Sequence, residues 1–294
     1  MERTTNKEET ESPQTSSLAK FVLLAYALTW VLLAPFFYLL NVRYGGEMQS
    51  WMWTIVPLAL LGGWGPSLAG IIVAARTGGR REVKKLFGKL LQWRASVLWY
   101  LLILTFPPAL TILSVLVVNR GFGAFRQLDA GSALTAIPFA YLLALPFGPL
   151  GEEFGWRGFA LPKLLTRYGA VRASLILGVI WTFWHIPMML WSPGAAIPTV
   201  MGLTVFSVAV FLIQITSETV LMTLAFLRTN GSLLLAVIFH TSLNTAEAVV
   251  FGGLPEPTAP YQRAVYLVNV ALLSAAAAAA LLYFAISHRK NSVE

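Results

Sequence analysis

Long apolar stretches alternate with short polar segments along the whole chain. Eight of these stretches approach or exceed the roughly 20 residues that a helix needs to cross the hydrocarbon core of a bilayer. They cover residues 18–41, 51–75, 96–118, 132–151, 172–191, 197–227, 231–252 and 261–287. Because lipid satisfies no backbone polar groups and these stretches lack the polar alternation of barrel strands, the pattern predicts helices. We therefore predict an all-α polytopic membrane protein with about eight transmembrane helices in one bundle.

The amino-acid composition supports this prediction. Of the 294 residues, 57% are hydrophobic and 12% are charged, whereas roughly 25% are charged in an average soluble domain. The mean hydropathy is +0.69. The chain contains no cysteine, so disulfides, thiolate metal ligands and a catalytic thiol are excluded. Zinc-finger and cysteine-protease functions are therefore excluded as well.

The polar ends of the chain divide it into two tails and one membrane domain. Residues 1–17 are rich in Thr, Ser and Glu and carry no apolar stripe. This is typical of a disordered, solvated tail rather than of a secretory signal. We predict a transmembrane domain over residues 18–288 and a short tail over residues 289–294.

The distribution of Lys and Arg predicts the orientation of the bundle. Of the 21 basic residues, 17 fall in the two tails, at Lys20 next to the first tail, in the connections 76–95 and 152–172, and at Arg228, which share one side of an eight-span bundle. The positive-inside rule then places both termini on the cytoplasmic side of the membrane. We expect that membrane to be the cell membrane. The net charge of +8 is thus a topology signal and does not indicate a nucleic-acid partner. Segment 76–95 mixes basic with apolar and aromatic residues, so membrane lipids are its predicted partner.

Few ionisable side chains lie within the apolar stretches. Each costs about 2.5–3.5 kcal/mol on insertion scales, so each needs a partner, a wet cavity or a function. With one amide among them, they are Glu152, Glu153, Arg157, His185, Glu218, His240, Asn244 and Glu247. The last three recur at helical spacing and are expected on one face.

The first three charges are expected to have different roles. Glu153 and Arg157 are four residues apart, so on a helix they share a face and can form a charge pair. Glu152 points about 100° away from that face and has no obvious local cation. We therefore predict that Glu153 and Arg157 form a structural pair beside an unpaired Glu152.

These residue types permit two interpretations. In the structural interpretation, the polar groups only hold helices together, because a single buried His or Asn in a membrane helix often forms an interhelical hydrogen bond. Three helices that contribute such groups also fit hydrolysis, because a carboxylate can take a proton from water, an imidazole can orient that water, and Asn or His donors can stabilise an oxyanion. Glu152 is then the predicted base. Glu152, His185 and His240 could instead form a zinc site with an open water position, although the chain has no H-E-x-x-H pair.

Three motifs carry a resemblance to a known family. The chain reads Glu152-Glu153-Phe-Gly-Trp-Arg157, then Trp181-Thr-Phe-Trp-His185, then His240-Thr-Ser-Leu-Asn244. In this order, over about residues 135–250, they resemble the E-E-x-x-x-R, F-x-x-x-H and H-x-x-x-N motifs of the CAAX prenyl endopeptidases of the Ras-converting type and the bacterial CPBP (Abi) intramembrane proteases. Trp181 stands where the family pattern has Phe, which keeps an aromatic packing residue at that position.

The resemblance implies an eight-helix intramembrane endopeptidase. Glu152 and His185 would activate water, His240 and Asn244 would stabilise the tetrahedral oxyanion, and Glu153 with Arg157 would support the base. The family has been described both as metalloproteases and as glutamate-dependent, metal-free enzymes. We favour the metal-free mechanism without a cofactor, and zinc on Glu152, His185 and His240 is the alternative.

Two functions without peptide hydrolysis are also compatible with the motif residues. One is a proton-coupled transporter, in which intramembrane carboxylates and histidines relay protons, although the chain shows no paired repeat. The other is a catalytically silent immunity or scaffold protein. For an endopeptidase, the resemblance implies a peptide or lipidated protein substrate, and the sequence does not determine whether that substrate is prenylated.

Overall fold

A computed structural model of the protein describes residues 13–39, 52–121, 130–191, 201–253 and 258–291, and within these every regular element is helical. The helices are α1 (Pro13–Tyr38), α2 (Met52–Gly63), α3 (Gly65–Gly88), the short 3-10 helix η2 (Lys89–Leu91), α4 (Val97–Asn119), α5 (Ala130–Phe147), α6 (Pro149–Glu153), the π-helical segment η4 (Phe154–Ala160), α7 (Leu161–Trp184), α8 (Ile186–Trp191), α9 (Val205–Arg228), α10 (Leu233–Gly253) and α11 (Ala259–Asn291). Helix α1 begins within the predicted tail 1–17, and residues 1–12 lie outside the described part of the chain.

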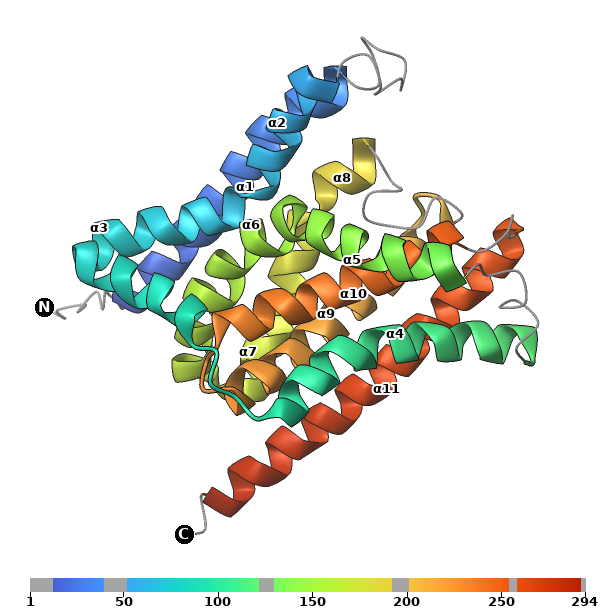
Figure 1. Cartoon of the computed structure of the whole chain (residues 1–294). Coiled ribbons are helices and arrows are strands. Elements are labelled where there is room, and N and C mark those ends of the chain that lie inside the picture. The colour runs from blue at the N-terminus through green and yellow to red at the C-terminus, as the bar shows by residue number, and fades with distance from the viewer. Residues whose placement is uncertain (1–12, 40–51, 122–129, 192–200, 254–257, 292–294) are drawn as a thin grey trace, which may run out of the picture.

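The helices form one bundle with α9 and α10 on the inside (Figure 1). Helix α10 packs against α4, α5, α6 and α9, whereas α9 also packs against α7 and α11. Helices α1, α2 and α3 form a group on one side, and α3 contacts both α6 and η4. The segment from α6 to η4 therefore lies between the α1–α3 group and α10, and it carries the first predicted motif.

The all-α, polytopic membrane architecture is confirmed, but the count of eight spans is not. Among the described residues, five helices are long and apolar enough to cross a membrane, or six if α2 and α3, bent by 53°, form one span. The predicted stretches 132–151 and 172–191 both overlap one 48-residue helical run, Ile137–Trp184, in which the chain turns at Gly169 with a φ of 70°. Within α10, the described range Leu233–Ala246 is apolar as well.

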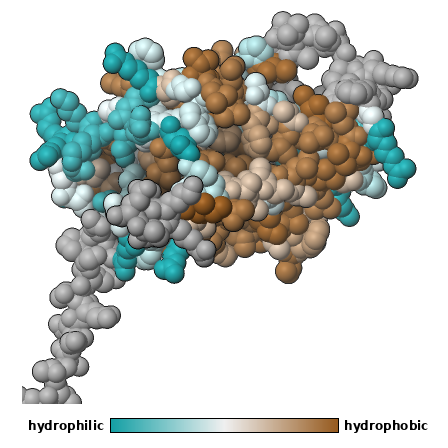
Figure 2. Space-filling model, turned by 90° about the horizontal axis from the view of Figure 1, so that it is seen from below, coloured by the Kyte–Doolittle hydropathy of each residue, from teal (hydrophilic) through white to brown (hydrophobic). Residues whose placement is uncertain are grey.

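The outer surface fits a membrane environment. Figure 2 shows broad apolar areas, with polar side chains gathered mainly towards one end of the molecule. Large apolar side chains such as Val97, Leu142 and Leu282 are more than half exposed on the outside of α4, α5 and α11. Continuous apolar surface of this kind is unusual for a soluble monomer. Such a surface is expected of a multi-pass membrane protein.

Two glycines bring the motif segment into direct contact with the preceding helices. A Cβ atom at Gly155 would lie 2.3 Å from the carbonyl oxygen of Pro66, and one at Gly151 would lie 2.8 Å from the carbonyl oxygen of Gly63. No larger side chain fits at either place without a shift of the backbone. Small residues four apart allow this close approach between membrane helices. The glycines thus fix the segment that presents Glu152.

Candidate active site

The first motif begins at a break in the helix. Helix α5 ends at Phe147, the chain turns at Gly148, and Pro149 starts the short helix α6. The helix then widens into the π-helical turn η4, a rare geometry that is often found at functional sites. Glu152 and Glu153 lie at the join between α6 and η4, and both are buried. The two carboxylates therefore need partners within the protein.

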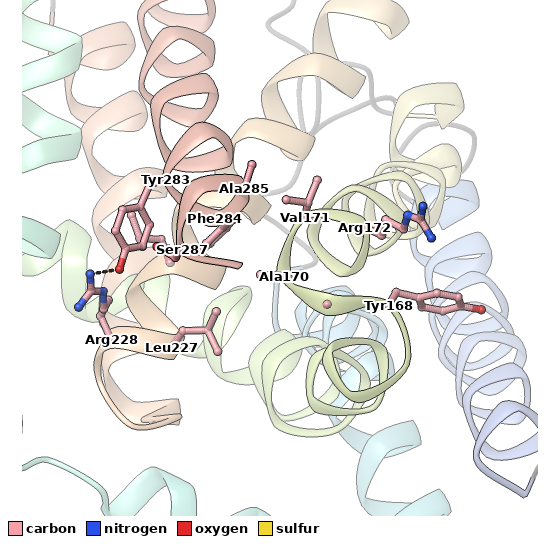
Figure 3. Close-up of a pocket in the computed structure, with 12 residues that line it drawn as sticks. Tyr168, Ala170, Val171, Arg172, Leu227, Arg228, Tyr283, Phe284, Ala285 and Ser287 are labelled. Atoms are coloured by element: carbon pink, nitrogen blue, oxygen red, sulfur yellow. Dashed lines mark hydrogen bonds between the residues drawn. The ribbon is translucent and has the colours of Figure 1, made fainter. Parts of the chain in front are cut away.

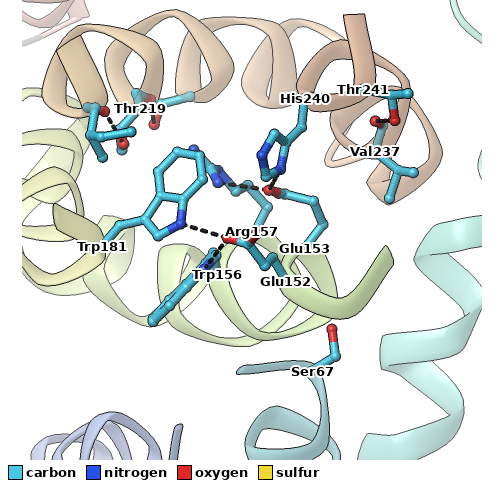
Figure 4. A network of polar contacts seen from close by, with 12 residues as sticks. Ser67, Glu152, Glu153, Trp156, Arg157, Trp181, Thr219, Val237, His240 and Thr241 are labelled. Atoms are coloured by element: carbon cyan, nitrogen blue, oxygen red, sulfur yellow. Dashed lines mark hydrogen bonds and ion pairs between the residues drawn. The ribbon is translucent and has the colours of Figure 1, made fainter. Parts of the chain in front are cut away.

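Glu153 has two such partners on its Oε1 atom. Arg157 Nη1 lies 2.8 Å away, one helical turn along, and His240 Nδ1 of α10 lies 2.8 Å away (Figure 4). The predicted pair of Glu153 and Arg157 is therefore present, and neither side chain has any exposed surface. Glu153 Oε2 and two guanidinium nitrogens of Arg157, Nε and Nη2, make no hydrogen bond within the described part of the chain. The contact of His240 with Glu153 joins α10 to the motif segment.

Glu152 has partners of another kind. Its Oε2 atom accepts hydrogen bonds from two indole N–H groups, those of Trp181 at 2.6 Å and Trp156 at 3.2 Å. Among the described residues the structure records no ion pair for Glu152, as its position on the helix predicted. The carboxylate is held by neutral donors only.

The second oxygen of Glu152 faces a small space beside Gly148. An ideal Cβ atom built at Gly148 would lie 3.5 Å from Glu152 Oε1 and 3.5 Å from Asn244 Nδ2. The carboxylate oxygen and the amide nitrogen therefore both lie within contact distance of one methyl-sized position. Asn244 is exposed on α10, whereas Glu152 is buried. Glu152 and Asn244, predicted as base and oxyanion donor, are brought together here.

His185 lies at the end of α7 beside this cluster. Its Nδ1 atom is 2.8 Å from the carbonyl oxygen of Trp181, and the rings of Trp184 and Phe211 pack edge-on against it at 4.7 and 5.2 Å. A carbonyl only accepts hydrogen bonds, so Nδ1 carries the proton and Nε2 of the neutral ring is an acceptor. Within the described residues His185 has no recorded polar contact with Glu152. The structure places it next to the other predicted residues through Trp181.

The alternative zinc site does not form as a ligand cluster. Among the described residues, no three His, Asp or Glu side chains are arranged to hold a metal ion. The hydrogen bonds of His240 Nδ1 with Glu153 and of Glu152 Oε2 with two indole N–H groups leave His240 Nε2, His185 Nε2 and Glu152 Oε1 as the atoms that a metal ion could use. Within the described residues these side chains are not gathered around one point, and no step is derived through a metal ion.

Sequence reasoning missed several polar contacts near the site. Glu218 of α9 accepts a hydrogen bond from Gln214 at 3.0 Å, and Gln214 accepts one from Tyr266 of α11 at 2.7 Å. The spacing of Gln214 and Glu218, four residues apart, is the only signal that could have paired them. Glu218 and Leu243 both line a small cavity between α4, α9, α10 and α11. The Glu247 side chain, predicted on the His240 face, lies outside what the structure describes.

A larger cleft lies elsewhere in the bundle. It has a volume of about 670 Å³ and is formed by α7 near Gly169, the end of α9 and the end of α11 (Figure 3). Its lining is mainly apolar, and Arg228 is hydrogen-bonded to Tyr283 at its edge. It contains no residue of the three motifs. The cleft is therefore separate from the candidate active site.

Comparisons with known proteins agree with the motifs. Residues 134–246 match the family model described as type II CAAX prenyl endopeptidase Rce1-like, which is close to the range 135–250 expected from the motifs. The chain is also 28% identical over 143 residues to a CAAX prenyl protease 2 of Methanococcus maripaludis, which covers 47% of this chain and 51% of that protein. The chain thus aligns with about half the length of this curated relative. Both comparisons support the resemblance to the CAAX prenyl endopeptidase family.

Proposed function

We propose, on the premise of this family match, that the protein is an intramembrane endopeptidase. It would hydrolyse a peptide bond of a membrane-associated substrate, with Glu152 as the base that activates water. The observation that carries the proposal is the asymmetric setting of the Glu152 carboxylate. Its Oε2 atom is held by two indole N–H groups, and its Oε1 atom faces the position beside Gly148 that Asn244 also faces. A base must be held firmly and must have one oxygen turned to the reacting water.

In the proposed reaction, a water molecule gives a proton to Glu152 Oε1 while its oxygen attacks the scissile carbonyl carbon. The carbonyl oxygen becomes an oxyanion, which accepts a hydrogen bond from Asn244 Nδ2. When the tetrahedral intermediate collapses, the carbon–nitrogen bond breaks and the protonated Glu152 gives its proton to the leaving amine. His185 Nε2, an acceptor in the neutral ring, can accept a hydrogen bond from the water and orient it.

His240 can assist the oxyanion only in one protonation state. Its Nδ1 atom faces the Glu153 carboxylate, which only accepts, so this nitrogen is already a donor. Nε2 can donate as well only if the ring is a doubly protonated imidazolium. The negative charge of Glu153 would balance that imidazolium, and Arg157 shares the same carboxylate. Glu153 and Arg157 thus support the proposed site through His240.

The proposal includes the setting of the enzyme. The substrate is a peptide or a lipidated protein, because the similar protein of Methanococcus maripaludis is named as a CAAX prenyl protease and the outer surface of this chain is apolar. Both termini face the cytoplasm of the cell membrane, and no resident metal is needed for the steps above. The family match favours neither the transporter nor the scaffold function.

The test uses the purified full chain in lipid nanodiscs. Cleavage is followed with a quenched fluorogenic peptide that ends in a farnesylated C-a-a-X sequence, and with the same peptide without the lipid. Glu152→Gln keeps the shape of the side chain but removes the base, so it should lose more than nine-tenths of the cleavage rate. The matched control is Glu218→Gln, a buried carboxylate that can still accept its hydrogen bond from Gln214 as an amide. Equal rates for the two variants would refute Glu152 as the base.

A second variant tests the position beside Gly148. An Ala methyl group there would make contacts of 3.5 Å with Glu152 Oε1 and Asn244 Nδ2, which are ordinary van der Waals distances. Gly148→Ala should therefore fold but exclude the reacting water and carbonyl. Gly88→Ala, where no atom lies within 4 Å of the new methyl group, is the control. Full activity of Gly148→Ala would contradict the proposed place of reaction.

A further inference from the structure

Trp181 has a central position among the site residues. Its side chain is 1% exposed, and its indole ring is packed between the other two motifs. The Arg157 guanidinium carbon lies 4.3 Å from the centre of the ring, and the His240 imidazole meets the ring edge-on with centroids 5.0 Å apart. Its backbone carbonyl faces His185 Nδ1 at 2.8 Å. One residue thus contacts a member of each motif.

The contact with Glu152 differs in kind from this packing. The Trp181 N–H donates to Glu152 Oε2 at 2.6 Å, across 29 residues of sequence and from another helix (Figure 4). Trp156 donates to the same oxygen at 3.2 Å from the same helix as Glu152. Two donors from different directions fix both the place and the rotation of a carboxyl group. The family motif has Phe at the position of Trp181. A Phe ring could fill the space but has no N–H group to donate.

We propose that Trp181 is a positioning residue for the base, in that its indole N–H holds Glu152 Oε2 so that Oε1 is presented to the position beside Gly148. The inference rests on the proposed function. It adds a positioning role for Trp181, which the motif pattern treats only as a packing residue. A hydrogen bond to a charged acceptor in a water-poor site is stronger than one between neutral groups. Loss of this donor should therefore lower kcat by about 10- to 100-fold.

The direct test compares two tryptophans. Trp181→Phe removes the donor, whereas Trp184→Phe removes an equally buried indole whose N–H donates to Thr29 instead. We expect Trp181→Phe to lower kcat with KM within about twofold of wild type, because the indole N–H points to the base and not to the substrate. Trp184→Phe should keep kcat within about threefold of wild type. A purely structural role would lower both variants alike, and that result would overturn the proposal.

A second replacement covers the case in which Trp181→Phe does not fold. Site-specific incorporation of 3-benzothienylalanine at residue 181 keeps the fused ring but replaces its N–H by sulfur. It should reproduce the loss of kcat while the melting temperature stays close to wild type. A benzothienyl variant with wild-type kcat would show that ring shape alone matters, and would refute the positioning role.

A third measurement does not depend on cleavage. The decrease in melting temperature caused by Trp181→Phe is measured in two backgrounds, the wild-type protein and the Glu152→Ala variant. If the N–H holds the carboxylate, the decrease in melting temperature should be clearly larger in wild type, because only there does the substitution remove one of the two indole donors of the Glu152 carboxylate. Equal losses in the two backgrounds would overturn the proposal. A wild-type protein that cleaves neither peptide would refute the proposed function instead, and the coupling would still decide whether Trp181 holds Glu152.

Discussion

The buried charge pair of Glu153 and Arg157 gives the sharpest stability prediction. Neither side chain has exposed surface, and Arg157 also lies over the Trp181 ring at 4.3 Å. Arg157→Met would leave the Glu153 carboxylate with His240 as its single partner among the described residues. Stranding one member of a fully buried pair costs about 3–5 kcal/mol. At about 2–4 °C per kcal/mol for a chain of this order of size, the melting temperature should fall by roughly 6–20 °C.

The assay is thermal unfolding in detergent, followed by the fluorescence of the ten tryptophans. Glu153→Gln should also be destabilising, because it leaves the guanidinium buried without its carboxylate. The double variant Glu153→Gln/Arg157→Met should lose less than the sum of the single variants, because no unpaired charge remains. Lys84→Met, which removes an exposed cation of α3, is the control and should melt like wild type. Single variants of the pair that melt within about 2 °C of wild type would refute this reasoning.

Two further predictions concern topology and metal. A single cysteine at Gly79, in the predicted cytoplasmic segment, should react with impermeant thiol reagents only after cell lysis. A new Cβ atom there has no neighbour within 4 Å, and the φ of 61° strains the backbone locally. Labelling of intact cells would reverse the orientation. If His240 and Asn244 are oxyanion donors, His240→Ala and Asn244→Ala should each lower kcat by about 10²–10³ and chelators should not affect wild type. Stoichiometric zinc that is lost together with activity in His240→Ala would contradict the metal-free mechanism.

Features that depend on local sequence were predictable. The helices follow from the apolar stretches, and the contact between Glu153 and Arg157 follows from their spacing of four residues. The absence of a local cation beside Glu152 follows from the same helical geometry. These features need no knowledge of how the helices pack, because each is decided within one or two helical turns.

Features that depend on packing between helices were not predictable. The hydrogen bond from Trp181 to Glu152 spans 29 residues and the contact of His240 with Glu153 spans 87, so neither leaves a periodic signal. The sequence indicates only an aromatic packing residue at Trp181, because the family pattern has Phe at this position. The number of spans also depends on backbone geometry, since the turn at Gly169 lies inside one continuous helical run.

The different partners of the two adjacent glutamates explain how the proposed site could contain both a structural charge and a base. Glu153 is bonded to the Arg157 guanidinium, so its negative charge is already paired within the bundle. Glu152 is held by indole N–H groups, which fix its orientation without adding a positive charge. Exchanging the partners would therefore remove the base even if both carboxylates stayed in place. The widened turn η4 starts directly after these two residues, with Trp156 and Arg157 adjacent within it, so that one side chain reaches Glu152 and the next reaches Glu153.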